Sequence, residues 1–427
     1  IPLKSKQRLH NKIAEKLEHL PYYEYKTQEL AHHYFSADRK EKAIQYLIAA
    51  GDIYKKEYAY DMAIKMYERA IKLVLHKPIP DQILNLLEKL GDTKALAEKY
   101  DAALEYYFKG LNLAQQQGKD TQAFHKGLGS IYLNKGEFNK SKDHFQILLD
   151  ILKAKQKDAS EELSLMASLQ VAIGAYDEAE KLLKEALEHA KKEDNEELQA
   201  AIYNDFSQIH FMRGNWSHAM NYYLRSFSIL RYSQEERLKA KVLRGIAKIY
   251  IYRGDNERAY TYLEKALYYC HITRDRKIRV LIEIDIATLF ENQGQLLKAQ
   301  TLYQDSLELA QDIEMKLGQA YAYMGLGRIN YLLEKNLQAI ENIDDSMELF
   351  KQLQLTWGEA NCYILLGEIY TNQGEYNKAH SMFNVAKQAL VSINMKWRLS
   401  SVYLGLEKLY RIEGKQGKAN KNLNQEL

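Results

Sequence analysis

A six-residue motif returns along this chain as GEFNKS at 136–141, GAYDEA at 174–179, GNWSHA at 214–219, GDNERA at 254–259, GQLLKA at 294–299 and GEYNKA at 374–379. Weaker copies occupy 58–63, 98–103, 334–339 and 414–419. Each copy closes on alanine, except for serine at 141, and from Ala179 onward these closing residues stand forty residues apart. Self-similarity at one fixed period indicates a repeat architecture of stacked supersecondary units.

The residues around the motif predict a pair of helices in each unit. Glycine usually opens the motif, and glycine is favoured where a helix ends in a left-handed turn. Small residues stand twelve positions before and seven after most closing residues, and large apolar residues often stand four after. On one helical face, small residues let neighbouring helices approach and large ones fill the flanking grooves. We therefore expect antiparallel helix pairs, each stacked on the next.

This pattern of small and aromatic residues, with glycine at the turn, resembles the tetratricopeptide repeat (TPR). The resemblance covers roughly residues 40–427, although most units here have forty residues, whereas the usual TPR unit has 34. It implies an all-α fold, a right-handed TPR superhelix (an α-solenoid) of about ten helix-turn-helix repeats. We expect a helical adaptor at 1–39, less regular TPR-like repeats at 40–160, and regular repeats at 161–427 that end in a polar helix.

Composition narrows the class of partner. The chain has 60 basic and 57 acidic residues, a net charge of +3, and this near balance argues against a nucleic-acid partner. Two lone cysteines, Cys270 and Cys362, exclude a disulfide scaffold and favour the reducing cytoplasm. No apolar run has the length of a membrane span. We predict a cytoplasmic protein with neither a nucleic-acid nor a membrane partner.

Catalytic patterns are absent from the sequence. It contains no GxxxxGK[ST] phosphate loop, no GxSxG and no HExxH. We therefore expect no catalytic residue, no metal site and no cofactor, and predict that this chain is not an enzyme.

The first helices carry a second resemblance. RLHNKIAEKLEHL at 8–20 and the segment 29–71 look like the entry into the TPR arm of STAND-type (MalT-like) signalling ATPases. In that family the arm follows a nucleotide-binding domain, and this chain begins at Ile1 without methionine. The resemblance implies a fragment of a longer protein, whose NTPase domain would also allow oligomerisation, with this arm as its sensor. The alternative is a free-standing TPR scaffold that binds partner peptides in its concave groove.

The first helix of each pair lines the concave face in proteins that resemble this one. Counting eighteen, fifteen, eleven, eight and seven residues back from the closing residues selects an inner stripe. From it we predict ligand- or partner-binding residues: Asn204, Gln208, Lys241, Arg244, Lys248, Tyr252, Asn292, Tyr321, Arg328, Tyr331, Asn361 and Asn372.

The chemistry of this stripe suits a protein or peptide partner. Lys241, Arg244 and Lys248 stack on one helix face, where like charges cost stability unless something opposes them. Asparagine amides both donate and accept, so they can clamp an extended peptide backbone. We expect an acidic or extended peptide, or a polar small-molecule effector; the alternative is a polar wall that only meets water. Trp357 and Trp397 share one place in successive units, and we expect each to pack on the preceding helix.

Overall fold

The computed structural model describes residues 2–21, 26–74, 80–155, 158–393, 395–415 and 417–419. Within them every regular element is a helix, and the fold is the predicted all-α solenoid of helix-turn-helix repeats. The chain divides into two compact units, residues 1–134 with 139–156 and residues 135–138 with 157–427. The three-part division that we expect from the sequence, with boundaries near residues 40 and 160, stays a prediction.

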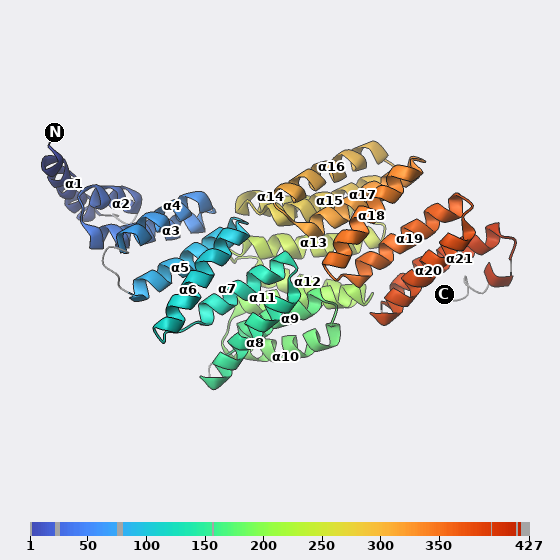
Figure 1. Cartoon of the computed structure of the whole chain (residues 1–427), viewed down its shortest axis with the longest axis horizontal. Helices are drawn as coiled ribbons and strands as arrows, with labels where there is room; N and C mark the ends of the chain where they lie inside the picture. The colour runs from blue at the N-terminus through green and yellow to red at the C-terminus, as the bar shows by residue number, and fades with distance from the viewer. Residues whose placement is uncertain are drawn as a thin grey trace. The chain divides into compact units, whose positions relative to one another are not determined.

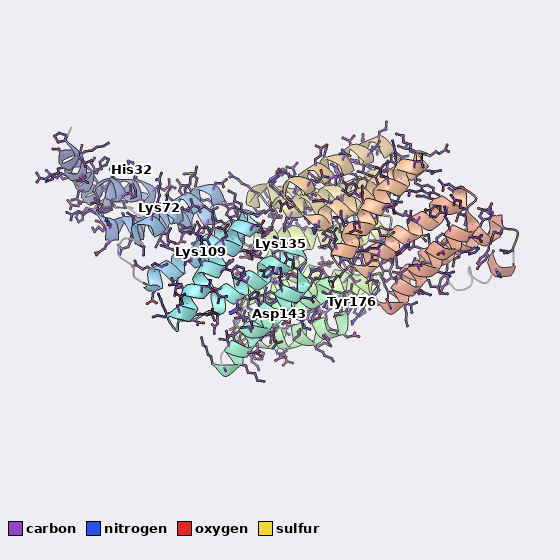
Figure 2. All side chains as sticks on the ribbon, in the orientation of Figure 1. His32, Lys72, Lys109, Lys135, Asp143 and Tyr176 are labelled. Carbon is purple, nitrogen blue, oxygen red and sulfur yellow. The ribbon has the colours of Figure 1, made fainter. Side chains whose placement is uncertain are left out.

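The first unit holds the less regular helices. They are α1 (Leu3–Glu18), α2 (Thr27–Ser36), α3 (Lys40–Lys56), α4 (Tyr60–Val74), α5 (Pro80–Leu96), α6 (Tyr100–Gln116), α7 (Gln122–Lys135) and α8 (Phe138–Ala154). Their apolar faces are buried against one another, while charged side chains such as Lys72 and Lys109 are exposed (Figure 2).

The second unit holds the regular forty-residue pairs (Figure 1). They are α9 (Ser160–Ala172) with α10 (Tyr176–Lys192), α11 (Glu196–Met212) with α12 (Trp216–Leu230), α13 (Glu236–Tyr252) with α14 (Asn256–Thr273), α15 (Arg276–Asn292) with α16 (Leu296–Asp312), α17 (Lys316–Leu332) with α18 (Asn336–Gln352), and α19 (Thr356–Asn372) with α20 (Tyr376–Ser392). The short 3₁₀ helix η2 (Lys396–Arg398) and α21 (Leu399–Ile412) follow. Most of the polar helix predicted at 418–427 lies outside the described residues.

The motif opens on a left-handed residue in both strong and weak copies. Gly254 and Gly374 have φ values of +75° and +79°. Tyr58, Glu98 and Glu334 open weak copies with φ values of +58°, +62° and +61°. The turn geometry is therefore a property of the repeat, and glycine is the residue that adopts it at least cost.

Small residues hold the rings that lock successive pairs together. Every closing residue is fully buried, as the repeat register predicts. The ring of Phe383 lies between Gly367 of its own pair and Gly405 of α21, where a Cβ would come within 2.8 Å and 2.4 Å of it. Tyr107 is held in the same way. Glycine, normally unfavourable inside a helix, is required here because the ring occupies the space of a side chain.

The two equivalent tryptophans behave differently. Trp357 packs on Phe350 of the preceding helix, with ring centroids 5.6 Å apart, as predicted. Trp397 also packs against the core to which α20 contributes, as predicted, but it makes a further contact that lies beyond its neighbouring helices. Its indole Nε1 donates to the carbonyl oxygen of Met212 at 2.7 Å, across 185 residues, and its ring lies 5.7 Å from that of Trp216. This Trp397 contact gives a partner to a carbonyl at the end of α11, where helices leave acceptors unpaired. It joins α11 to η2, which are the two ends of one turn of the solenoid.

Candidate ligand-binding site

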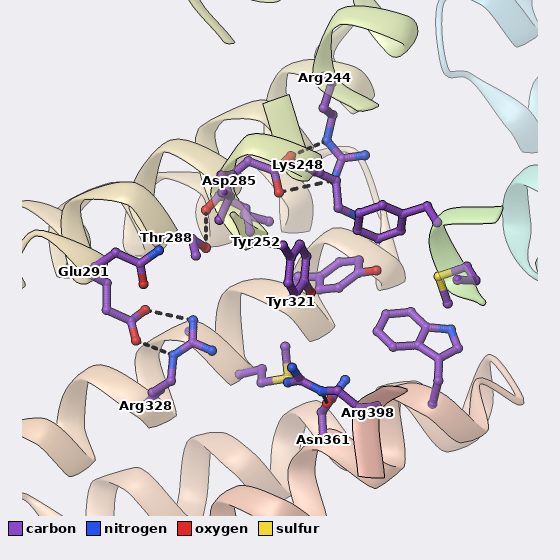
Figure 3. A pocket seen from close by; sticks show the side chains of 18 of the residues that line it. Arg244, Lys248, Tyr252, Asp285, Thr288, Glu291, Tyr321, Arg328, Asn361 and Arg398 are labelled. Carbon is purple, nitrogen blue, oxygen red and sulfur yellow. Dashed lines mark hydrogen bonds and ion pairs between the residues drawn. The ribbon is translucent and has the colours of Figure 1, made fainter. Parts of the chain in front are cut away.

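A cavity of about 500 Å³ lies inside this turn of the second unit (Figure 3). Its wall comes from the first helix of five successive pairs, α11, α13, α15, α17 and α19, with additions from α16 and the segment around η2. Polar and charged lining residues are Arg244, Lys248, Asp285, Thr288, Glu291, Asn292, Arg328, Asn361 and Arg398. Aromatic ones are Phe211, Tyr252, Tyr303, Tyr321, Trp357 and Trp397, and Met212, Ile251, Ile284, Met324 and Met395 supply much of the aliphatic surface.

Two ion pairs tie neighbouring repeats together in this wall. Arg244 Nε lies 2.6 Å from Asp285 Oδ2, and both side chains are largely buried, at 18% and 12% exposure. Arg328 Nη2 donates to Glu291 Oε2 at 2.8 Å. Although burial alone would lower the pKa of Arg328, Tyr303 and Glu291 hold it above its usual value. The two ion pairs link α13 to α15 and α15 to α17.

Two further cations in the wall have no ion pair within the described part of the chain. Lys248 Nζ lies 4.9 Å from the centroid of the Phe211 ring. Burial, together with the nearby guanidinium of Arg244, lowers the pKa of Lys248 to about 8, although Asp285 acts in the opposite direction. Arg398 Nε donates to Asn361 Oδ1 at 2.9 Å, which is a neutral partner.

Seven of the twelve predicted residues line the cavity: Arg244, Lys248, Tyr252, Asn292, Tyr321, Arg328 and Asn361. The sequence thus located seven of the fifteen lining residues that α13, α15, α17 and α19 contribute. Of the three stacked cations, Arg244 is opposed by Asp285, and Lys241 lies outside the lining.

The other four predicted residues form two separate polar contacts. Asn204 and Gln208 donate to Asp205 Oδ1 at 3.2 and 3.4 Å, and Asn204 is buried, so it does not belong to an exposed stripe. Asn372 Nδ2 donates to the Tyr331 hydroxyl at 2.5 Å. Neither pair reaches the cavity.

The sequence analysis missed Asp285, but a signal for it existed. Asp285 stands fourteen residues before Ala299, a repeat position at which Gly325 and Gly405 make room for the preceding unit's aromatic ring. In the unit before Asp285, the residue at the position of that ring is Leu263. The smaller leucine leaves room for an aspartate at the position that glycine otherwise occupies. The same relation holds for Leu183 and Asp205. Trp397 is marked by the repeat position that it shares with Trp357, which also lines the cavity, whereas no comparable signal marks Arg398.

Neither a metal centre nor a membrane segment emerges from the described residues. No group of three or more His, Cys, Asp or Glu side chains among them is placed to hold a metal ion. None of the described helices has the length and apolar character that crossing a bilayer requires.

Stacked helix pairs around a polar and aromatic cavity define an α-solenoid of the TPR type. Residues 159–231 and 240–270 match family models of the tetratricopeptide repeat. The chain therefore carries tetratricopeptide repeats, as the resemblance implied. No curated protein matches the chain in sequence.

Several solved structures share the fold. A Rap protein in complex with the competence and sporulation factor superposes with a TM-score of 0.53 at 16% identity, over 71% of this chain and 96% of that one. NprR in complex with its cognate peptide NprX gives 0.55 at 17% identity, over 70% and 88%. A STAND protein with a TPR sensor, from Pyrococcus horikoshii, gives 0.42 at 16% identity, and this chain, matched over 85% of its length, covers 52% of that protein. For the Rap protein and NprR, at these identities, the likeness shows the fold alone.

Proposed function

We propose that the second unit is a non-catalytic binding module that holds a peptide, free or within a partner protein, in its cavity. The observation that carries this proposal is the convergence of polar and aromatic side chains from five successive repeats on one space of about 500 Å³. That volume is within the range of typical ligand sites, which is about 300–1,000 Å³. The two ion pairs between repeats use only part of this polar lining, and the remaining cations and asparagine amides are available for recognition.

The lining offers what an extended peptide requires. Asn292 and Asn361 can donate to and accept from a peptide backbone, while Tyr321 and Trp357 offer apolar faces to its side chains. The Rap and NprR structures, which share the fold, are complexes with a factor and with a peptide, and this supports a peptide ligand here.

At a finer level, we propose that the module is the sensor arm of a cytoplasmic STAND-type signalling ATPase. A ligand that binds one curvature of the turn better than another would shift the equilibrium of the attached ATPase. The resemblance of residues 8–20 and 29–71 to the entry of such arms supports this proposal. The rival is a free-standing scaffold that uses the same cavity. The gene upstream of residue 1 distinguishes them: a phosphate loop supports the sensor, and a nearby start codon supports the scaffold.

Two asparagines at the same repeat position allow a controlled test. Asn292 and Asn372 each stand seven residues before a closing alanine and are exposed, but only Asn292 lines the cavity. A library of synthetic pentapeptides is passed over the immobilised protein, and retained peptides are identified by mass spectrometry. We expect Asn292→Trp to abolish retention by filling the cavity, and Asn372→Trp to retain the wild-type set. Equal retention by wild type and both variants would place recognition elsewhere on the chain.

A further inference from the structure

We infer that the cavity selects peptides of net negative charge, whose carboxylates pair with Lys248 and Arg398. This inference rests on the proposed function and names the class of peptide that the site takes.

Charged side chains in the lining do not balance. Arg244, Lys248, Arg328 and Arg398 are cationic, while Asp285 and Glu291 are the carboxylates among the lining residues. Each carboxylate already has an arginine partner, Asp285 with Arg244 and Glu291 with Arg328. Two positive charges therefore remain in surplus within a partly open, partly aromatic space.

The immediate neighbours of these two cations do not neutralise them. Lys248 faces the Phe211 ring, and its nearest influence of opposite sign, Asp285, is engaged by Arg244 at 2.6 Å. Arg398 has a neutral amide, Asn361, as its hydrogen-bond partner and stands over the Trp397 ring at 5.7 Å.

One further carboxyl group acts on Arg398 from outside the lining. Glu368 of α19 is influenced by Lys408 and Arg328 as well as by Arg398, and burial raises its pKa. It is therefore shared among three cations, and it forms no ion pair with Arg398.

An unneutralised cation in a partly desolvated wall is unfavourable, and a ligand anion removes that cost. The attraction is also stronger where water is excluded. Figure 3 shows Arg244 and Lys248 on one side of the cavity and Asn361 with Arg398 on the other, with Tyr252 and Tyr321 between them. Two separated positive positions with aromatic rings between them suit two carboxylates on one short peptide better than a single compact anion. Those carboxylates are an acidic side chain and a free C-terminus.

Four pools of synthetic pentapeptides test this. The pools combine the presence or absence of Asp and Glu with a free or an amidated C-terminus, and peptides retained by the full chain are then measured singly by isothermal titration calorimetry. We expect affinity to fall by about tenfold or more for each carboxylate removed, which is the usual effect of losing a hydrogen bond to a charged group.

Variants assign the carboxylates. Lys248→Met should abolish the preference for one carboxylate and Arg398→Met the preference for the other. The matched control is Lys265→Met, because Lys265 Nζ also lies over a ring, 5.6 Å from the Tyr262 centroid, but outside the cavity. Equal binding of neutral, amidated peptides overturns the inference and leaves the proposed function standing. If no pool is retained, the proposed function fails and the inference fails with it.

A second measurement needs no ligand. Since Lys248 is an unneutralised cation, Lys248→Met should leave the melting temperature of the free protein unchanged or raise it, relative to Lys265→Met. A fall relative to that control would show that Lys248 stabilises the fold, and would overturn its assignment as a ligand contact.

Discussion

Replacing Gly214 with alanine tests the Trp397 contact that closes the second unit. Gly214 has a φ of +77°, and a Cβ there would lie 2.8 Å from both Cγ and Cδ1 of Trp397. Alanine would therefore carry two penalties: the left-handed conformation, about 1–2 kcal/mol, and overpacking against the indole, about 1–3 kcal/mol. Gly254 has a φ of +75° and no atom within 4 Å of its Cβ position, so Gly254→Ala carries the first penalty alone.

The expected difference between the two variants is about 1–3 kcal/mol in the free energy of unfolding. Urea titration followed by circular dichroism measures it, with the two glycine variants and wild type in parallel. The indole N–H signal of Trp397 in a ¹H–¹⁵N spectrum should shift in Gly214→Ala and stay in place in Gly254→Ala. Equal losses of stability in the two variants would refute the reasoning, because they would show that the indole does not occupy this space.

Three other changes have defined outcomes. Arg244→Met should destabilise the protein by about 3 kcal/mol, because it leaves the largely buried Asp285 unpaired. Adding Asp285→Leu should restore most of that loss in urea titrations. Equal losses in the single and the double variant would contradict this. Ala259→Leu should cost about 1–3 kcal/mol, since Ala259 is fully buried between helices, and an unchanged melting temperature would show that the repeat register is wrong. Affinity for N-acetylated acidic pentapeptides, whose charge is constant over this range, should fall as pH rises from about 7 to about 9.5, because Lys248, whose pKa is about 8, loses its charge. Calorimetry on Lys248→Met should show a flat profile, and a flat wild-type profile would exclude Lys248 as a contact.

The repeat geometry could be predicted from the sequence because it depends on local rules. The closing residues, the glycine turns and the small residues that accommodate rings are all set within one or two helix pairs, so a forty-residue period reveals them. Even Tyr58 and Glu98, which break the glycine pattern, adopt the left-handed turn because the two flanking helices require it.

The cavity could be predicted only in part. The inner stripe found residues that point inward from regular first helices, such as Arg328 and Asn361. It missed Arg398 and Trp397, which lie where a 3₁₀ turn replaces the usual first turn of the helix. The contact of Trp397 with the end of α11 depends on the rotation accumulated over all the intervening repeats, and a nearest-neighbour pattern carries no information about that sum.

The Trp397 contact also changes how this solenoid is expected to unfold. A linear array of repeats has free ends, and each repeat is held only by its neighbours, so unfolding can begin at either end and spread. The Trp397 contact joins residues 185 positions apart, and the stacked helices between them already hold the two ends together, so little chain entropy is lost in making it. The segment from α11 to η2 is thus a closed turn of the solenoid, because its two ends contact each other. Loosening the helices after residue 395 should therefore also loosen the last turn of α11, and amide hydrogen exchange near Met212 and near Trp397 should rise together.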